Sequence, residues 1–474
     1  MTQQKQAPLV VDLDGTLIRT DLLIESFMLL IKQNIFNLFM VVLWLLKGKA
    51  TLKAEIARRV DIPVELLPYN QDLIEYLKKE KAKGREIILA TASHVRYAHS
   101  VARHVGLFDD VLASDDTRNL SGATKRAALT ERYGEKQYVY AGNAPVDLKV
   151  WDHCQQAIVV GSQGLAQRAS RHCSIEHHIQ PAKPGLKVIL KALRVHQWVK
   201  NALILVPLLT SHIITDPAAL LLGMLAFFAF SFCASSVYFL NDLLDLNDDR
   251  RHATKRNRPF AAGTLSLVAG LVGTPLLLLL SIAICWFLPW EFALVLGIYY
   301  VLTVAYSFSL KRIVMVDVIT LAALYTVRIV AGAAAVSVTL SFWLLSFSVF
   351  VFLSLAIVKR YTELMKLKEK SARKALGRGY QVEDLELLSS LGGASGYLSV
   401  LVLALYINSP EVKSLYHEPQ LMWPACLILL YWVSRIWIIA HRGNMDDDPI
   451  VFALKDKISV VCGGLIGLFM MLAV

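Results

Sequence analysis

The sequence predicts a chain in two parts, an α/β domain followed by an all-α membrane domain. Near position 190, an ordinary globular composition gives way to recurring apolar runs of membrane-spanning length. Before that position, short apolar strands alternate with helix-like stretches, which is typical of a parallel sheet. Over all 474 residues, 55% are hydrophobic and only 18% are charged, a balance that is rare in soluble proteins of this size.

The α/β part is predicted from short apolar runs that end at polar residues. The first run, LVVDLD, ends in two carboxylates and is broken by Gly15-Thr16. Residues 21 to about 85 lie between the first two strands and are helical in pattern, so we expect them to form a cap over the sheet. The predicted strands are 9–14, 86–90 and 138–141, and the predicted helices between them include 70–83 and 125–133.

One stretch of this cap, residues 24–47, is unusually long and apolar. Polar residues, among them Lys32 and Asn34, interrupt it, so a complete membrane span is not favoured. Two interpretations stay open. The stretch is either a buried cap helix, or a helix that dips into the membrane surface and lets a lipid reach the soluble site.

The second part begins after a polar segment, residues 163–184, which we interpret as a linker. Residues 185–198 then place apolar residues at helical spacing with basic residues opposite, a pattern typical of a helix that lies on a membrane. About nine transmembrane helices are predicted after it. Their ranges are 201–214, 218–240, 265–287, 292–309, 314–333, 341–358, 393–408, 420–440 and 457–473.

The formal net charge of +11 reflects 49 Lys and Arg against 38 Asp and Glu, and the basic residues gather in alternate loops. By the positive-inside rule, these loops and the soluble domain before the first span are cytoplasmic. We therefore expect a multi-pass protein of a bacterial inner membrane, and we leave open whether it forms a homo-oligomer. No basic stripe carries interleaved aromatic residues, so a nucleic-acid partner is not expected.

Asp12 and Asp14, one residue apart at the end of the first strand, suit phosphoryl transfer. The first carboxylate can attack phosphorus, and the second can protonate the leaving oxygen and later activate water. This DLDGT motif resembles the haloacid dehalogenase (HAD) superfamily, and the resemblance covers about residues 8–162. It implies a Rossmann-like α/β fold, a phosphatase activity and one bound Mg²⁺.

The resemblance assigns further site residues in the order that the family uses. Thr91, in ILATAS, matches the hydroxyl that holds the phosphate, and Ser93 is a second candidate for that role. Lys125, in GATKRAAL, matches the lysine that steadies the nucleophile and the phosphate. Asp147, in YAGNAPVDLKVW, matches the acidic residue that binds Mg²⁺ together with Asp12, and Asp14 completes the predicted metal set.

One position departs from the family pattern. HAD members usually carry Asp directly after the glycine of the last motif, where this sequence has Asn143. We expect a magnesium site with one less negative charge and count Asn143 among the substrate-binding residues. The alternative is a weakened or purely structural domain that serves as a regulatory or membrane-docking module.

An acidic cluster, NDLLDLNDD, follows the second predicted span. Spacings of three and four residues place its oxygen ligands on one face of a helix. Such a cluster at a membrane boundary is costly unless it binds cations, and hard oxygen ligands suit Mg²⁺, which in turn binds a diphosphate. The predicted metal ligands are Asn241, Asp242, Asp245 and Asp249, and the basic residues expected to hold the outer diphosphate oxygens are Lys255 and Arg258.

The acidic cluster resembles the first aspartate motif of the UbiA superfamily, and the number of spans agrees with that fold. The resemblance covers residues from about 185 to 474 and implies a magnesium-dependent membrane transferase in which Asp245 and Asp249 are catalytic. The family's second motif is often another Asp pair after the fourth span. Here YSFSLK leads only to Asp317, which departs from the members that prenylate aromatic acceptors.

Three further segments, RVHQWVKN, YSFSLK and KRYTEL, resemble one branch, the decaprenyl-phosphate phosphoribosyltransferases. The resemblance implies phosphoribosyl pyrophosphate as donor and a polyprenyl phosphate as acceptor. Arg328, inside the fifth span, is either a cation for the lipid phosphate or a helix-packing arginine capped by carbonyls. The other candidate substrate-binding residues in this half are Gln197, Lys200, Asn201, Asp242, Lys255, Arg258, Tyr306, Lys311, Asp317, Lys359 and Arg360.

These patterns together predict a HAD-like phosphatase domain at 1–162, a linker at 163–184 and a UbiA-like membrane domain at 185–474. We expect a bifunctional enzyme that transfers 5-phosphoribose to a polyprenyl phosphate and then removes the 5-phosphate, with one Mg²⁺ at each site. The alternative is a prenyltransferase that loads a polyprenyl group, from its diphosphate, onto a small or aromatic acceptor and carries a regulatory HAD domain. The missing second Asp pair and the QWVKN segment count against this alternative.

Overall fold

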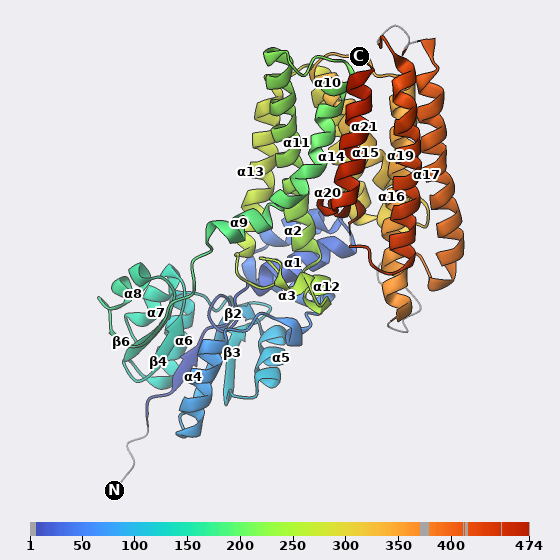
Figure 1. The fold of residues 1–474 in the computed structure, drawn as a ribbon. Helices are drawn as coiled ribbons and strands as arrows, with labels where there is room; N and C mark the ends of the chain where they lie inside the picture. Colours follow the sequence, from blue (N-terminus) through green and yellow to red (C-terminus); the bar gives the residue numbers. More distant parts are fainter. Residues whose placement is uncertain (1–5, 370–378, 411, 413–415, 447, 474) are drawn as a thin grey trace. The chain divides into compact units, whose positions relative to one another are not determined.

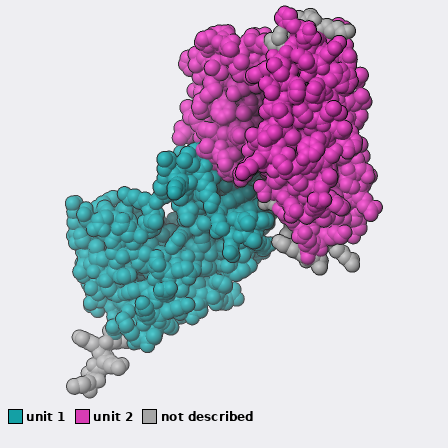
Figure 2. Space-filling model, viewed as in Figure 1, with its two compact units in different colours: residues 1–193, 238–274 teal, residues 194–237, 275–474 magenta. Residues whose placement is uncertain are grey.

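The computed structural model describes residues 6–369, 379–410, 412, 416–446 and 448–473. The chain divides into two compact units (Figure 2). Unit 1 comprises residues 1–193 and 238–274, and unit 2 comprises residues 194–237 and 275–474. The division does not follow the predicted domain border, because residues 238–274 of the membrane half cluster with the soluble domain.

Unit 1 is built on a parallel six-stranded sheet with the order β3-β2-β1-β4-β5-β6. Its inner strands are buried on both faces, which suits their Val, Ile, Leu and Ala content. The strand order reverses at β1, and in such sheets ligands bind beyond the carboxyl ends of the strands at this point. The strands are β1 (Leu9–Val11), β2 (Ile87–His94), β3 (Asp110–Ser114), β4 (Val139–Gly142), β5 (Gln156–Val160) and β6 (Ser174–Ile179).

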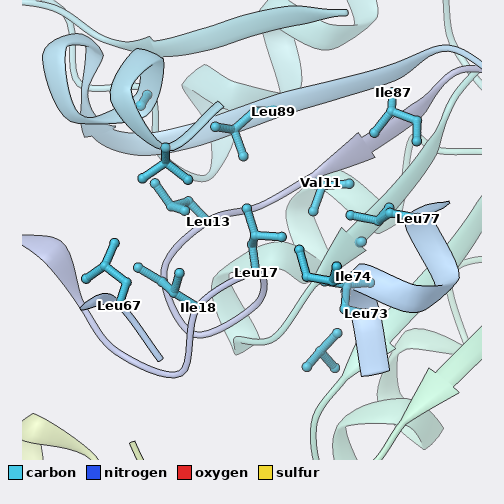
Figure 3. Packing of buried hydrophobic residues seen from close by; sticks show 14 of the residues in the cluster. Val11, Leu13, Leu17, Ile18, Leu67, Leu73, Ile74, Leu77, Ile87 and Leu89 are labelled. Atoms are coloured by element: carbon cyan, nitrogen blue, oxygen red, sulfur yellow. The ribbon is translucent and has the colours of Figure 1, made fainter. Parts of the chain in front are cut away.

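Helices cover both faces of this sheet (Figure 1). On one face, Leu73 and Leu77 of α4 (Gln71–Ala82) pack against Val11 and Leu89 of the sheet, and α5 (Val95–Val105) lies beside them (Figure 3). The other face is covered by α6 (Ala123–Tyr133), α7 (Leu148–Trp151) and α8 (Gln163–Ala169). The cap over the sheet consists of α1 (Leu22–Gln33), α2 (Asn37–Leu46), α3 (Lys49–Arg59) and a 3₁₀ turn, Val64–Leu66.

The predicted α/β fold with a helical cap is confirmed, but the predicted linker needs a correction. Residues 163–184 contain α8 and β6, and β6 pairs in parallel with β5 as the edge strand of the sheet. An edge strand is solvated along one side and can therefore be polar. Because the sequence of β6, SIEHHI, is polar, its pattern does not predict a strand. The sheet therefore ends at Ile179, and only the few residues before α9 (Leu186–Ala192) connect the two halves.

Seven helices within the described residues are long and apolar enough to cross a membrane, and the predicted count of about nine is approximate. Residues 457–473 form α21 (Lys457–Leu472), which is apolar but shorter. The seven helices are α11 (Pro217–Leu244), α13 (Leu267–Cys285), α14 (Trp290–Phe308), α15 (Val316–Ala335), α16 (Phe342–Glu369), α17 (Leu385–Ile407) and α19 (Trp423–His441).

The first predicted span, 201–214, is not one regular helix. It consists of a long 3₁₀ segment, η3 (Val195–Leu205), followed by the short α10 (Val206–Thr210). Close packing inside unit 2 fixes η3, because a Cβ at Gly332 of α15 would lie only 1.9 Å from the carbonyl oxygen of Ile204. Pro207 in α10 also lacks the amide hydrogen that a continuing helix needs.

Unit 2 has its main apolar core where α16 packs against α15 and α17. Large side chains such as Phe352 and Tyr361 of α16 and Ile436 of α19 are buried there. Residues 238–274, the part of the membrane half that belongs to unit 1, contain the end of α11 at Leu244 and a short helix, α12 (Leu246–Arg251). The acidic motif runs from α11 into α12. The acidic motif therefore lies in the same unit as the α/β domain.

Candidate functional site

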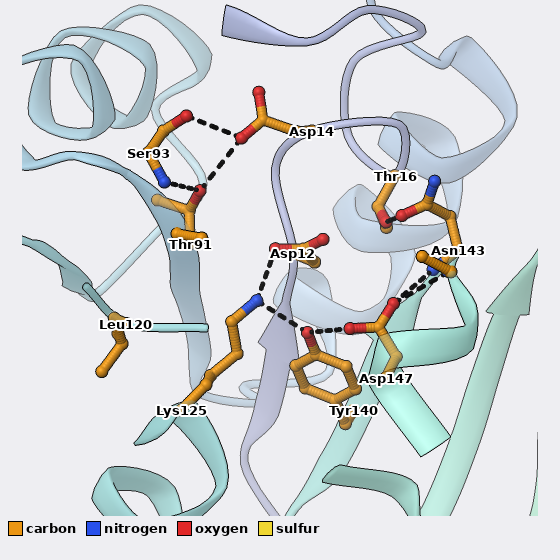
Figure 4. A network of polar contacts seen from close by, with 12 residues as sticks. Asp12, Asp14, Thr16, Thr91, Ser93, Leu120, Lys125, Tyr140, Asn143 and Asp147 are labelled. Atoms are coloured by element: carbon orange, nitrogen blue, oxygen red, sulfur yellow. Dashed lines mark hydrogen bonds and ion pairs between the residues drawn. The ribbon is translucent and has the colours of Figure 1, made fainter. Parts of the chain in front are cut away.

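Asp12 follows β1 directly and lies at the point where the strand order reverses. Lys125, on α6, donates to Asp12 Oδ1 at 2.6 Å and to the Tyr140 hydroxyl at 2.9 Å (Figure 4). Tyr140 in turn donates to Asp147 Oδ1 at 3.0 Å. The parallel sheet and the helix beside it thus bring together three segments that are distant in the sequence, which carry Asp12, Lys125, and Tyr140 with Asp147.

Asp147, the predicted ligand of Mg²⁺, is held in place by backbone hydrogen bonds. Its Oδ2 accepts from the backbone amides of Asn143 and Ala144 at 3.0 and 2.9 Å. Burial, together with the charge of Asp12, raises the pKa of Asp147 to about 6. A divalent cation bound beside Asp147 would favour the ionised form of its carboxyl group and lower this pKa.

Asp14 is placed by contacts from two sides. Its Oδ2 accepts from Ser93 Oγ at 2.6 Å and from Thr91 Oγ1 at 3.4 Å, and its Oδ1 accepts from the amide of Leu22 at 2.8 Å (Figure 4). Burial, reinforced by the charge of Asp21, raises the pKa of Asp14 to about 7. A carboxyl group with this pKa can carry a proton near neutral pH, which suits a general acid.

The pH dependence of hydrolysis follows from this pKa. We expect kcat for a phosphate ester to fall as the pH rises through about 7, because Asp14 is protonated below its pKa and loses the leaving-group proton above it. The measurement is kcat from about pH 5 to pH 9, with Asp14→Asn as the comparison. A rate that stays level through neutral pH would contradict the assignment of Asp14 as the acid.

Asn143 packs against the motif loop. Its Oδ1 accepts from Thr16 Oγ1 at 3.0 Å. Gly15 has φ +75°, and a Cβ at this position would lie 2.1 Å from Asn143 Nδ2, so only glycine fits beneath the amide. The side chain thus supports the DLDGT loop, and its expected contact with substrate stays a prediction.

The cap contributes a residue to this region that sequence reasoning missed. Lys53, on α3, donates to the carbonyl oxygen of Ala92 at 2.5 Å and to Asn119 Oδ1 at 2.8 Å. Burial lowers its pKa, while the charges of Asp14 and Asp21 act in the opposite sense. The sequence around it, KATLKAE, carries no motif that singles it out. Tyr140 was missed for a different reason, since a tyrosine within an apolar strand is interpreted as a core residue.

In the membrane half, Arg258 joins two of the predicted acidic ligands. Its Nη1 lies 3.2 Å from Asp242 Oδ1 and 2.7 Å from Asp249 Oδ2. Both carboxylates are buried, and burial raises the pKa of Asp249 to about 6. A buried carboxyl group whose pKa stays raised beside a guanidinium fits the binding of an additional cation.

The predicted single face of acidic ligands is divided in two. Helix α11 ends at Leu244, and Asp245 leaves the helix as the N-cap of α12. Its carboxylate, with that of Asp248, binds Lys32 of the cap, with Nζ 2.7 Å from each. Asn241 is half-buried on the last turn of α11, where its carbonyl oxygen accepts from the Asp245 amide.

In unit 2, two predicted lysines converge on a carboxylate that was not predicted. Lys200 of η3 is buried and forms an ion pair with Asp448, and Lys359 Nζ lies 3.6 Å from the same carboxylate. Although burial acts against it, these two cations hold the pKa of Asp448 well below its usual range. Asp448 lies in MDDDP, a run that reads as a solvated acidic loop.

A second cluster of unit 2 gathers three predicted residues. Arg360 Nε donates to Asp317 Oδ2 at 2.5 Å, and Arg360 Nη2 donates to the Tyr306 hydroxyl at 3.1 Å. Tyr380, which was not predicted, donates to Asp317 Oδ1 at 2.6 Å. Asp317 and Arg360 are fully buried, so this cluster ties the start of α15 to α16.

Arg328 is directed to protein groups. It donates to Asn201 Oδ1 at 2.8 Å and to the Tyr299 hydroxyl at 3.2 Å, and it also bonds the carbonyl oxygen of Leu324. These contacts support the helix-packing alternative over a cation for the lipid. Of the other candidates, Gln197 is half-buried in η3, Lys311 is half-buried in the turn Leu310–Arg312, and Lys255 is exposed in the turn Lys255–Asn257.

No group of three or more His, Cys, Asp or Glu side chains among the described residues is arranged to hold a metal ion. Mg²⁺ commonly uses only one or two carboxylates and takes its other ligands from water and substrate phosphates. The pair Asp12 and Asp147 and the pair Asp242 and Asp249 fit this mode, because each is buried and contains a carboxyl group with a raised pKa. Asp14 was also predicted as a ligand, and its place in the metal site stays a prediction.

Comparison with known proteins decides the family. Residues 202–455, more than half of the chain, match the model of the UbiA prenyltransferase family. The chain belongs to the UbiA family. Residues 9–150 match the model of haloacid dehalogenase-like hydrolases, so this UbiA protein carries a HAD-like domain at its start. With its seven long apolar helices it is a multi-pass membrane protein.

Relatives share either the whole arrangement or the membrane half. An uncharacterized protein, y4nM, of Sinorhizobium fredii is 37% identical over 98% of this chain and 90% of its own length. The decaprenyl-phosphate phosphoribosyltransferase of Mycobacterium tuberculosis is 36% identical over 59% of this chain and 91% of its own. A UbiA homolog from Archaeoglobus fulgidus, bound to DMAPP and Mg²⁺, covers 60% of this chain and 98% of its own, with 16% identity and a TM-score of 0.46.

Proposed function

We propose that this protein transfers 5-phosphoribose from phosphoribosyl pyrophosphate to a polyprenyl phosphate, and that its HAD domain then removes the 5-phosphate to give polyprenyl-phosphoryl ribose. The observation that carries the proposal is the combination of two parts in one chain. A HAD-like site with its nucleophile in place accompanies a sequence that is 36% identical to a decaprenyl-phosphate phosphoribosyltransferase. A phosphoribosyl transfer leaves a 5-phosphate on the lipid, and a phosphatase removes such a group.

In the transfer step, the bond from the anomeric carbon to the pyrophosphate oxygen breaks, and an oxygen of the lipid phosphate forms the new bond to that carbon. Mg²⁺ at the aspartate motif would stabilise the charge on the leaving pyrophosphate. Asp242 and Asp249 would hold it, with Arg258 beside them. Lys200 and Lys359 share one carboxylate, Asp448, which leaves them with a net positive charge that suits the lipid phosphate.

In the hydrolysis step, Asp12 attacks the 5-phosphate, and the bond from phosphorus to the ribose oxygen breaks. Asp14 gives its proton to that oxygen, and it then takes a proton from the water that releases inorganic phosphate from Asp12. Lys125, 2.6 Å from Asp12, keeps the carboxylate ionised and oriented for both attacks. One chain holds both sites, so the lipid product is retained near the second one by its membrane anchor.

The test uses full-length protein in lipid nanodiscs with Mg²⁺, labelled phosphoribosyl pyrophosphate and a polyprenyl phosphate. We expect a labelled lipid whose mass corresponds to ribose without the 5-phosphate. A lipid that keeps the 5-phosphate would overturn the assignment of the HAD domain. No labelled lipid from this donor, with labelling of an aromatic acceptor from a polyprenyl diphosphate instead, would overturn the transfer step and favour the prenyltransferase alternative.

The cap supports a substrate that stays in the membrane. Nine apolar residues between Ile35 and Leu46 are exposed, and Phe39 and Leu46 keep 72% and 80% of their surface accessible. Only Val41 and Trp44 of α2 are buried, so the buried-helix interpretation does not fit this structure. Ten helical residues extend about 15 Å, half of what a span needs. We therefore infer that α2 lies in the membrane surface.

Removing this apolar surface is expected to affect lipid substrates alone. For the double variant Phe39→Ser and Leu43→Ser, we expect kcat/KM toward a lipid-linked phosphate in nanodiscs to fall about tenfold, since two exposed apolar side chains lose their transfer free energy. Hydrolysis of p-nitrophenyl phosphate is expected to stay unchanged. The matched control, Phe39→Leu with Leu43→Met, keeps the apolar surface and should behave as the native protein. Equal losses on both substrates would contradict the membrane contact.

A further inference from the structure

Lys32, in the last turn of the cap helix α1, contacts the acidic motif of the membrane half. Its Nζ lies 2.7 Å from Asp245 Oδ1 and 2.7 Å from Asp248 Oδ2. All three residues belong to unit 1, so this contact forms within one compact body. The side chains of Lys32 and Asp245 are each about three-quarters buried. One cation of the HAD domain thus pairs with two carboxylates of the transferase motif.

A buried ion pair holds α1 against the motif. Arg250 donates to both oxygens of Glu25, at 2.9 and 2.6 Å, and both residues are buried. Thr20 also donates to Glu25, at 2.5 Å, and Arg250 Nε donates to the carbonyl oxygen of Ala261 at 3.0 Å. Bidentate pairs of this kind fix relative orientation as well as distance. Two turns further along the same helix, Lys32 is therefore presented to Asp245 in a defined position.

The backbone packs closely at the same junction. Gly263 has φ +66°, and a Cβ there would lie 2.8 Å from Arg19 Cβ and 3.1 Å from the Arg19 carbonyl oxygen. No other residue type fits this loop without displacing the chain that follows the DLDGT motif. The cap and the motif loop are thus in contact through tightly packed backbone as well as through their long charged side chains.

The acidic motif divides its charge between two cations. Arg258 binds Asp242 and Asp249, whereas Lys32 binds Asp245 and Asp248. Asp245 is one of the oxygen ligands expected for Mg²⁺, and a metal ion and an ammonium group compete for the same lone pairs. An ammonium group released from Asp245 remains tethered to α1, within reach of an anion held at the motif.

We propose that Lys32 is a donor-binding residue of the transferase, although it comes from the HAD cap. It pairs with Asp245 and Asp248 in the absence of metal, and it turns to the diphosphate oxygens of the donor when Asp245 joins Asp242 and Asp249 as a ligand of Mg²⁺. This inference rests on the proposed function in one respect, which is that the donor is phosphoribosyl pyrophosphate. The charge exchange itself requires only a magnesium diphosphate, so pyrophosphate serves as the probe.

The test compares Lys32→Met with Lys32→Arg and with Lys78→Met, which removes an exposed lysine from α4 of the same unit. Each is made in full-length Asp12→Asn protein in nanodiscs, to suppress metal binding at the HAD site. Calorimetry measures Mg²⁺ binding alone and then pyrophosphate binding at saturating Mg²⁺. For Lys32→Met we expect Mg²⁺ to bind about fivefold more tightly and pyrophosphate at least about tenfold more weakly. Lys32→Arg and Lys78→Met should keep both affinities.

Opposite shifts of the two affinities distinguish a charge-exchanging residue from one that only supports the loop. A loss of both affinities in Lys32→Met, or no change in either, would overturn the proposal. Hydrolysis of p-nitrophenyl phosphate by Lys32→Met with Asp12 intact should match the native rate and reports that unit 1 is folded. Opposite shifts in a protein that does not label lipid from phosphoribosyl pyrophosphate would retain this inference and reject the proposed donor.

Discussion

Replacing Asp12 by Asn is expected to lower the rate of phosphate-ester hydrolysis by at least about a thousandfold, because the variant has no nucleophile. The amide occupies the same space, so Lys125 keeps its contact with the Tyr140 hydroxyl. With phosphoribosyl pyrophosphate and a polyprenyl phosphate, the variant should accumulate the lipid that keeps its 5-phosphate. The measurements are p-nitrophenyl phosphate hydrolysis and mass analysis of the lipid extract.

A surface variant and a melting curve control this experiment. Removing one charge of a buried ion pair destabilises a protein by about 3–5 kcal/mol, so thermal unfolding must show that the Asp12→Asn domain is folded. Asp152→Asn changes an exposed carboxylate at the end of α7 in the same domain and should keep native activity. Hydrolysis by folded Asp12→Asn at more than a few per cent of the native rate would contradict the role of Asp12.

Replacing Asp249 by Asn is expected to lower lipid labelling at least about a hundredfold, because the motif loses a ligand for the metal that stabilises the leaving pyrophosphate. Arg258 would keep Asp242 as its partner, so the loop should stay in place. Hydrolysis of p-nitrophenyl phosphate should be unchanged in the same preparation. The measurement is the initial rate of transfer from labelled phosphoribosyl pyrophosphate in nanodiscs.

Glu386→Gln, at an exposed position of α17, is the matched carboxylate control and should label lipid at the native rate. Added Mg²⁺ should restore little activity to Asp249→Asn, because the defect lies in the ligand and in the geometry it imposes. If Asp249→Asn transfers at the native rate, the aspartate motif does not hold the donor. Loss of hydrolysis as well would indicate that unit 1 had misfolded.

The soluble site was predictable because its residues follow strands of a parallel sheet. Asp12, Thr91 and Asp147 each come directly after an apolar run or close behind it, and the carboxyl ends of parallel strands meet at one edge. Lys125 was predictable from the order in which the HAD superfamily places its motifs. Tyr140 carries no such signal, because only the folded sheet shows that its hydroxyl bridges Lys125 and Asp147.

Contacts between distant segments could not be predicted. Lys32 and Asp245 are 213 positions apart, and Lys200 and Asp448 are 248 apart, so neither pair shares a sequence pattern. In the sequence, Lys32 only interrupts an apolar stretch. In the structure, it is the residue of that stretch that pairs with the acidic motif. The spacing argument for the acidic ligands failed at Asp245 because the helix ends one residue before it.

Their partners separate the basic candidates of the membrane half, because Arg328, Arg360 and Lys200 are all buried. The sequence makes all three residues candidate cations for the lipid phosphate, since each lies in or beside an apolar run, and it leaves a helix-packing alternative open for Arg328. In the structure Arg328 is occupied by Asn201, Tyr299 and a carbonyl oxygen, whereas Lys200 shares a single carboxylate with another lysine. The difference lies in how many neutral or acidic partners surround each cation, which depends on packing alone.

The ion pair between Glu25 and Arg250 also determines how the chain threads the bilayer. Two side chains in direct contact cannot lie on opposite sides of a hydrocarbon layer about 30 Å thick, so the HAD domain and the loop after α11 emerge from the same leaflet. A crossing by α11 then requires residues 194–216 to make the opposite passage. At about 2 Å per 3₁₀ residue and 1.5 Å per α-helical residue, η3 and α10 together extend about 30 Å. That length approaches the thickness of the hydrocarbon layer, whereas the same residues wound entirely as an α-helix would extend only about 24 Å.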